Sequence, residues 1–234
     1  MPWTERTRLL LGDEAVRRLQ GLRIILFGVG GVGSWCAEAL ARAGVGSLTL
    51  VDFDRVSPTN INRQLPALHS TIGQLKVDVL RQRLLDINPQ AEVQALPAMY
   101  TPDEAHTFAL DTYDYVIDAI DSLPNKAHLL ATASRLPRPR LLSSMGAARR
   151  CDPLQVRVGS FNKVRGCPLA RALRGLLKRQ GLLPLPTFQC VYSEEPPQPS
   201  DPLQRGAYGS LVTVTAAFGL TLAFLVINDT YPYS

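Results

Sequence analysis

The sequence has 234 residues, 46% of them hydrophobic and 19% charged, which is enough for one sizeable α/β domain with its own core. The formal net charge of +5 is compatible with an RNA partner but does not require one. The four cysteines form no C-x-x-C pair, which argues against a disulfide framework and a four-cysteine zinc site. The first residues lack a signal-peptide core, and we expect a cytoplasmic protein.

After a short helix predicted over residues 13–19, residues 24–54 have the pattern of a β-α-β unit. The apolar run at 24–27 indicates a strand buried on both faces, and it is followed by a predicted helix over 34–43 and a strand over 48–51. Four glycines form a G-x-G-G-x-G turn after the first strand: Gly28, Gly30, Gly31 and Gly33. Because glycine lets bare backbone approach a phosphate, the unit predicts a nucleotide site. The alternative is a glycine-rich turn without a ligand.

Polar residues follow the second strand and continue into the next predicted helix. Asp52 closes the strand, where a carboxylate can bind a ribose hydroxyl. The other members of this run are Asp54, Asn60, Asn62, Arg63, Gln64, Gly73 and Lys76. Arg63 and Lys76 suit a triphosphate, with the guanidinium as a fork and the ammonium as a point charge. The nucleotide therefore need not be NAD.

The remaining elements alternate between helices and strands. Helices are predicted over residues 76–86, 102–110, 125–134 and 169–180, and strands over 92–96, 115–119, 140–144 and 155–158. This alternation predicts an α/β fold with a doubly wound, mainly parallel sheet. We expect a single domain over residues 1–234.

Carboxylates follow the strand predicted over residues 115–119. The end of a parallel strand faces the ligand crevice, so Asp121 and the neighbouring Ser122 are placed to contact a nucleotide. A carboxylate at this place also suits a hard cation such as Mg²⁺, which prefers oxygen ligands. The alternative is that Asp121 caps the following helix.

The second half of the chain contains an amphipathic helix and a long apolar run. Basic residues surround the helix predicted over 169–180: Lys163, Arg165, Arg171, Arg174 and Lys178. They indicate either contact with RNA or an ordinary solvated surface. Residues 211–227 form an apolar run of 17 residues. A membrane span needs about 20, so we expect a buried helix in the core or at a dimer interface.

Several stretches resemble known families. DFDRVSPTNINRQ at residues 52–64 and GQLKVDVL at 73–80 resemble the ubiquitin-activating-enzyme-like superfamily, whose bacterial members include ThiF, MoeB and HesA. The SSMGA…DP pattern from residue 143, KVRGCPLA at 163–170 and VYSEEP at 191–196 are similar to the tRNA threonylcarbamoyladenosine dehydratase family. The resemblance covers nearly the whole chain.

The resemblance implies a Rossmann-like fold of the ThiF/MoeB type and an ATP-dependent reaction on tRNA. The carboxylate of an N6-threonylcarbamoyl group on the adenosine beside the anticodon would be adenylated, and the group would then close into a ring with net loss of water. The resemblance also implies a homodimer in which an N-terminal arginine reaches the partner subunit's ATP. Residues 1–150 would form the nucleotide-binding half, and residues 151–234 the substrate-side and dimerisation half.

Individual residues also receive roles from the resemblance. The catalytic candidates are Arg6, Arg63, Lys76 and Asp121, with Arg8 as the alternative to Arg6 and with Mg²⁺ at Asp121. The implied ATP contacts are Gly28, Gly30, Gly31, Gly33, Asp52, Asp54, Asn60, Arg63, Gln64, Lys76, Asp121 and Ser122. Cys167 could carry an acyl group, as in ubiquitin-activating relatives, or could be a semi-buried thiol. Ring closure within one group needs no catalytic cysteine.

Three other functions stay open at this point. An enzyme that adenylates the C-terminus of a sulfur-carrier protein would share the fold, but many such enzymes carry paired C-x-x-C zinc ligands, which this sequence lacks. In an NAD-dependent oxidoreductase, Arg63, Lys76 and Asp121 would have no function. A non-catalytic relative would not need the full set of phosphate-handling residues.

Overall fold

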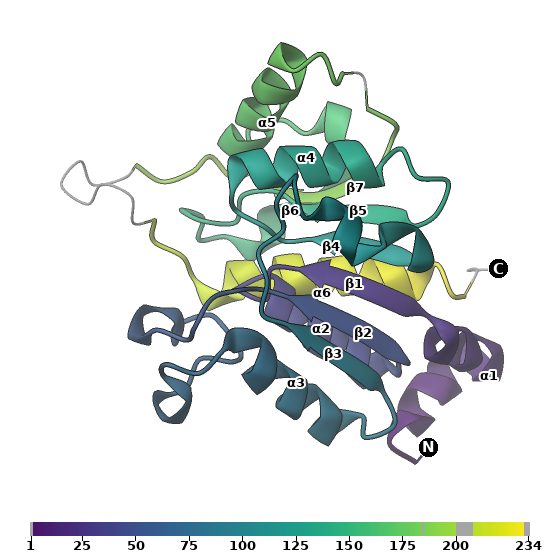
Figure 1. The fold of residues 1–234 in the computed structure, drawn as a ribbon. Helices are drawn as coiled ribbons and strands as arrows, with labels where there is room; N and C mark the ends of the chain where they lie inside the picture. The colour runs from purple at the N-terminus through teal and green to yellow at the C-terminus, as the bar shows by residue number, and fades with distance from the viewer. Residues whose placement is uncertain (1, 184, 200–207, 232–234) are drawn as a thin grey trace.

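A seven-stranded sheet lies between two layers of helices in the computed structural model, which describes residues 2–183, 185–199 and 208–231 (Figure 1). The strands run in the order β3-β2-β1-β4-β5-β7-β6. Their bounds are β1 Arg23–Phe27, β2 Ser47–Val51, β3 Glu92–Leu96, β4 Tyr115–Asp118, β5 Arg140–Ser144, β6 Val156–Ser160 and β7 Gln189–Ser193. Every neighbouring pair is parallel except β6 and β7, which confirms the predicted doubly wound, mainly parallel sheet.

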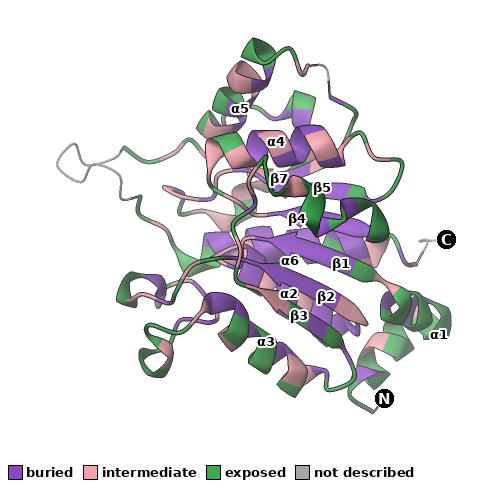
Figure 2. Ribbon diagram, in the orientation of Figure 1, coloured by how far each residue is buried: buried purple, intermediate pink, exposed green. Residues whose placement is uncertain are grey.

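Helices cover both faces of the sheet. One face carries α2 Gly33–Ala43, α3 Lys76–Ile87 and α6 Val212–Asn228, and the other carries α4 Leu123–Ala133 and α5 Pro168–Arg179. Successive residues of β1 point to opposite faces, so Ile24 packs with the first group of helices and Ile25 with the second. Figure 2 shows the central strands buried between the two layers. This burial on both faces explains the continuous apolar run from which β1 was predicted.

The first helix, α1 Glu5–Gly21, is longer than predicted and bends at Gly12. Gly12 has a φ of 84°, in the left-handed region that glycine adopts without a steric penalty. The part before the bend carries Arg6, which is exposed, and Leu10, which is 83% exposed. The part after the bend buries Leu19 in the core. The bend therefore separates a packed segment from one that reaches into solvent.

Two elements differ from the prediction. Residues 102–110 were predicted as a helix but form parts of two 3-10 turns, Ala105–Phe108 and Leu110–Thr112. Ala109 between these turns has a φ of 44°, a left-handed conformation that cannot continue a helix. Strand β7 was not predicted, and it lies between β5 and β6. Its insertion turns β6 into the antiparallel edge strand of the sheet.

The apolar run at 211–227 forms the helix α6, as predicted, and packs against α2. A Cβ on Gly219 would overlap the carbonyl oxygen of Val32, so the two helices approach closely at this glycine. Leu222 is fully buried, whereas Leu220 on the outer face is 49% exposed. In the described part of the chain, no helix is long and apolar enough to cross a membrane.

Candidate nucleotide-binding site

The turn between β1 and α2 requires glycine at two of its four predicted positions. Gly28 has a φ of +86°, and a Cβ at this position would lie 2.7 Å from the carbonyl oxygen of Ala119. A Cβ on Gly33 would overlap the carbonyl oxygen of Gly28. The residue before α2 is Val32, which offers no side-chain hydrogen bond to the helix. The N–H of Ser34 already donates to the carbonyl oxygen of Gly30 at 3.1 Å. The other N–H groups at the start of α2 can receive an anion at the tight turn.

Gly30 and Gly31 face the loop that follows β2. A Cβ on Gly31 would lie 3.3 Å from Cγ of Arg63, and one on Gly30 would lie 3.7 Å from Nε2 of Gln64. The loop is attached to α2, because Nε1 of Trp35 donates a hydrogen bond to the carbonyl oxygen of Arg63 at 3.1 Å. Predicted nucleotide contacts from two separate stretches of sequence therefore lie side by side.

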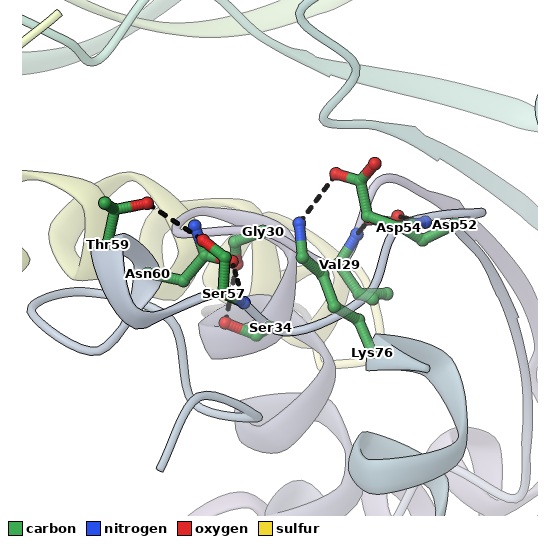
Figure 3. A network of polar contacts seen from close by, with 9 residues as sticks. All are labelled: Val29, Gly30, Ser34, Asp52, Asp54, Ser57, Thr59, Asn60 and Lys76. Atoms are coloured by element: carbon green, nitrogen blue, oxygen red, sulfur yellow. Dashed lines mark hydrogen bonds and ion pairs between the residues drawn. The ribbon is translucent and has the colours of Figure 1, made fainter. Parts of the chain in front are cut away.

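The Asp52 carboxylate holds the glycine turn in place (Figure 3). Its Oδ2 accepts the Val29 N–H at 2.8 Å, and its Oδ1 accepts the Asp54 N–H at 2.9 Å. Burial raises the pKa of the Asp52 carboxyl above its ordinary value, and these two hydrogen bonds act in the opposite direction. Each oxygen keeps a further lone pair, so the carboxylate can still accept a ribose hydroxyl as predicted.

Lys76 and Asp54 form an ion pair beside the glycine turn. Lys76 is the first residue of α3 and is 5% exposed. Its Nζ lies 2.7 Å from Oδ2 of Asp54, as Figure 3 shows. Its backbone N–H also donates to the carbonyl oxygen of Asp54 at 3.0 Å. The lysine is thus fixed beside the carboxyl end of β2. A phosphate group bound there would compete with Asp54 for the positive charge of Lys76.

Polar side chains also organise the loop after β2. Oδ1 of Asn60 accepts the Ser57 N–H at 3.1 Å and stabilises a 3-10 turn. Arg63 donates to Oδ1 of Asn62 at 2.8 Å. Oε1 of Gln64 is buried and has no hydrogen-bond partner among the described residues. Since an unsatisfied buried oxygen is unfavourable, Gln64 marks a position where a ligand donor fits.

A buried polar network lies at the end of β4. Asp118 and Lys126 are both 0% exposed, and Nζ of Lys126 lies 2.6 Å from Oδ2 of Asp118. The same oxygen accepts the Ser143 hydroxyl at 2.6 Å. Lys126 also donates to the carbonyl oxygen of Ile120 at 3.0 Å, and Oδ1 of Asp118 accepts the Ile120 N–H at 3.1 Å. Four polar contacts therefore fix the backbone that leads to Asp121.

Asp121 itself is exposed and forms no hydrogen bond or ion pair with the described residues. The N-cap of α4 is Ser122, so the alternative that Asp121 caps this helix is wrong. Sequence reasoning missed Lys126. A signal existed, because Asp118 closes a strand buried on both faces and needs a nearby counter-charge. Lys126 in the first turn of the following helix could have supplied that charge.

Arg6 and Arg8 both lie on the exposed first part of α1. Arg6 forms no hydrogen bond or ion pair with the described residues of its own chain. Arg8 forms an ion pair with Asp13, with Nε 3.7 Å from Oδ1. The structure brings neither arginine into hydrogen-bond contact with the loop after β2.

The basic helix α5 differs in part from its prediction. Ala172 of this helix is exposed, although an amphipathic helix would place its apolar residues on the core face. Arg174 was expected on the basic face, but its NH1 donates to the carbonyl oxygen of Phe161 at 3.1 Å and its guanidinium lies over the Phe161 ring. Arg171 and Lys178 are exposed as predicted. Cys167 occupies the N-cap position of α5 and is 3% exposed, so its thiol is buried.

A model of the ThiF family matches residues 4–229, and the chain belongs to this family. A Bacillus subtilis protein named tRNA threonylcarbamoyladenosine dehydratase is 43% identical over 192 residues, which cover 82% of this chain and 74% of the relative. A Haemophilus influenzae protein of the same name is 35% identical over 234 residues, which cover 94% and 89% of the two chains.

A solved structure gives the same result. The crystal structure of the Escherichia coli tRNA N6-threonylcarbamoyladenosine dehydratase in complex with ATP matches with a TM-score of 0.87 and 36% identity. The match covers 97% of this chain and 92% of that one. These relatives confirm the resemblance to tRNA threonylcarbamoyladenosine dehydratases that the motifs after β2 and β5 predicted.

Proposed function

We propose that the protein is an ATP-dependent tRNA threonylcarbamoyladenosine dehydratase. The observation that carries the proposal is the meeting of the glycine turn, the Arg63–Gln64 loop and Lys76 at the carboxyl ends of β1 and β2. In an open parallel sheet, this edge is where nucleotides bind. Similarity to the named dehydratases over most of the chain supports the substrate.

The reaction has two steps. A carboxylate oxygen of the N6-threonylcarbamoyl group attacks the α-phosphorus of ATP, and pyrophosphate leaves. A nucleophilic atom of the same group then attacks the activated carbonyl carbon, loses its proton, and AMP leaves, so that one water is lost overall. Ring closure is intramolecular, which supplies proximity without a covalent enzyme intermediate. Arg63 and Lys76 bind the phosphates and neutralise their charge.

The residues present fit a Mg²⁺ ion at Asp121. Its carboxylate is exposed and uncommitted, whereas the buried Asp118 carboxylate is paired with Lys126. Mg²⁺ is commonly bound by one or two carboxylates together with substrate phosphates, so one protein carboxylate is sufficient. When bound, the ion would supply positive charge to the phosphates. The buried network behind Asp121 holds its backbone in a fixed position.

We also propose that the active unit is a homodimer in which Arg6 acts on the nucleotide of the partner subunit. Support comes from the exposed position of Arg6 and from apolar side chains in solvent on α1 and α6, such as Leu10 and Leu220. Mixing inactive Arg6→Ala with inactive Lys76→Ala should then restore part of the activity in mixed dimers. Confirmed subunit exchange without rescue would contradict the shared site.

Mass spectrometry of tRNA nucleosides tests the activity. The substrate is tRNA whose threonylcarbamoyladenosine has not yet been cyclised. After incubation with the protein and ATP, this nucleoside should lose one water while ATP yields AMP and pyrophosphate. The control is the Lys76→Ala variant, which should produce little of either product. If instead a small sulfur-carrier protein becomes adenylated and the tRNA stays unchanged, the protein is a carrier-activating relative.

A further inference from the structure

Two adjacent arginines follow strand β5 and leave polar side-chain atoms without partners. Arg150 is 2% exposed, and its Nε and both terminal nitrogens have no hydrogen-bond partner in the described part of the chain. Nε of Arg149 is also buried and has no hydrogen-bond partner in the described residues, while the guanidinium of Arg149 lies over the Tyr208 ring. These four atoms are the majority of the seven buried side-chain polar atoms without a partner in the described residues. Unsatisfied donors are thus concentrated at one place.

A buried guanidinium needs an anion. Arginine stays protonated in proteins, so burial cannot neutralise Arg150 as it can a lysine or a carboxyl group. A buried charge without a counter-charge strongly destabilises a fold. In the described part of the chain, Arg150 has no hydrogen-bond or ion-pair partner that could supply this counter-charge.

Two acidic side chains of the loop that follows Arg150, Asp152 and its contact Glu195, already have other partners. The Glu195 carboxylate accepts the backbone N–H of Cys151 at 3.0 Å and that of Asp152 at 2.9 Å. Oδ1 of Asp152 accepts the Leu154 N–H at 2.9 Å. These carboxylates stabilise the loop and do not pair with Arg149 or Arg150.

Backbone contacts locate the arginine pair relative to the candidate nucleotide site. The N–H of Arg149 donates to the carbonyl oxygen of Gly209 at 2.8 Å. On the other side of this segment, Nδ2 of Asn62 donates to the carbonyl oxygen of Ser210 at 2.8 Å, and Arg63 in turn donates to Asn62. The short segment before α6 therefore lies between Arg63 and the arginine pair.

The backbone of Arg149 also has an unusual conformation. Its φ is 60°, in the left-handed region that a residue with a Cβ rarely adopts. Residues other than glycine in this region are uncommon, and backbone strain of this kind is concentrated at binding sites. The strained backbone of Arg149 therefore adjoins the unsatisfied donors of Arg149 and Arg150.

We propose that Arg149 and Arg150 form an oxyanion site that receives the carboxylate of the acceptor substrate, an inference that rests on the proposed function. In the proposed function the polyphosphate has its own cations, Arg63 and Lys76. A carboxylate is small and planar and matches the fork of a guanidinium group. The carboxylate to be adenylated must also lie next to the phosphates, and the backbone of the pair is linked through Gly209 and Ser210 to the loop that carries Arg63.

Thermal unfolding tests the site without enzyme activity. Sodium acetate should raise the unfolding temperature of the wild-type protein above its value in sodium chloride of equal ionic strength. In Arg150→Met, which removes the buried charge, the temperature in chloride should be higher than in wild type and acetate should have no added effect. The control is Arg157→Met, an exposed arginine on β6 that should keep the acetate effect. If Arg150→Met does not fold, Arg149→Met takes its place.

Two results would contradict the carboxylate site. A lower unfolding temperature in chloride for Arg150→Met, with the acetate effect intact, would show that the arginine only supports the fold. Sodium pyrophosphate is the second anion to be compared. Stabilisation by pyrophosphate that depends on Arg150, without any by acetate, would assign the site to the nucleotide phosphates and overturn the proposal.

Steady-state kinetics separate this inference from the proposed function. Arg150→Met should raise KM for the acceptor tRNA at least tenfold and leave KM for ATP within twofold of the wild type. The free modified nucleoside should bind more tightly than its uncharged methyl ester to the wild type, and the variant should lose this preference. A wild-type protein that converts no tRNA would refute the function. Normal conversion with an unchanged acceptor KM in the variant would refute only the carboxylate site.

Discussion

Lys76 is the residue on which the phosphate chemistry most depends, because it is almost buried and forms an ion pair with Asp54, and its charge also acts on Asp52. Lys76→Ala and Arg63→Ala should each leave the fold intact and slow ATP consumption by roughly a hundredfold or more, the effect of losing one preorganised charge. ATP consumption in the presence of acceptor tRNA is the measurement. Arg55→Ala, an exposed neighbour in the same stretch, is the control and should keep the wild-type rate.

Glu38 gives a pH dependence that can be predicted with its sign. Burial raises the pKa of Glu38, but hydrogen bonds from Arg83 and Arg42 outweigh it and lower the pKa below its ordinary value of 4.5. A lowered folded-state pKa means that the carboxylate stabilises the fold above its unfolded pKa. This stabilisation is lost as the pH falls through the folded-state pKa.

The expected result is that Glu38→Gln destabilises the protein by about 1 kcal/mol at pH 7 and by progressively less below about pH 4. Urea unfolding of both proteins at several pH values measures the difference. Glu14→Gln serves as the control, because Glu14 is exposed and its partners lie on the same helix. A constant difference between wild type and Glu38→Gln at all pH values would contradict the assignment.

At the scale of elements, the contact between α2 and α6 depends on one glycine. A Cβ on Gly219 would overlap the carbonyl oxygen of Val32, so Gly219→Ala should force the helices apart and cost about 1–3 kcal/mol. Gly175 lies within α5, where a Cβ would meet nothing closer than 3.6 Å. Gly175→Ala should therefore stabilise the protein by about 0.5–1 kcal/mol. In denaturant unfolding, the midpoint should fall for Gly219→Ala and rise for Gly175→Ala. Equal shifts of the midpoint in the two variants would contradict the packing argument.

The network at the end of β4 should behave as a coupled unit. Lys126→Met or Asp118→Asn alone leaves one buried polar partner uncompensated, and each should cost about 3–5 kcal/mol. The double variant should cost clearly less than the sum of the two single changes, as a double-mutant cycle by denaturant unfolding can measure. Strict additivity would mean that the two side chains do not interact in solution.

The sequence predicted the elements that have a clear period and missed those that depend on distant contacts. The run at 24–27 is apolar at every position because helices cover both faces of β1, so its burial was readable. Residues 102–110 contain helix-forming residues, but the left-handed Ala109 interrupts them, and single residues carry no such signal. Strand β7 lies between two segments that contain prolines, and its place beside β5 depends on tertiary pairing.

The candidate site was predictable to the extent that its residues follow one another along the chain. The glycine turn, Asp52 and the loop to Lys76 were found because strand ends and phosphate-binding residue types occur in order. The sequence reasoning did not find the ion pair of Lys126 with Asp118, which joins α4 to the end of β4. Nor could it show that Arg150 is buried, because its burial depends on how separate segments fold over it.

At the scale of the whole molecule, the modest net charge of +5 does not account for specific tRNA binding, so a local basic surface must provide it. Arg171 and Lys178 are exposed on α5, whereas Arg174 is held against Phe161. Reversing Arg171 and Lys178 to Glu should weaken tRNA binding and reduce its salt dependence, with ATP affinity unchanged. Filter binding at several salt concentrations is the measurement, and Arg17→Glu on α1 is the charge-reversal control. An unchanged salt slope would place the tRNA on another surface.

The position of β7 has a consequence for how the chain folds during synthesis. In the described sheet, β6 pairs only with β7, although it leaves the ribosome first. Until residue 193 emerges, β5 presents an open edge and β6 has no place in the sheet. The helix α6 emerges later still and completes the layer beside α2. A nascent chain that has already made the glycine turn and Lys76 therefore carries an open edge and a bare face, both of which promote aggregation, until its final helix is available.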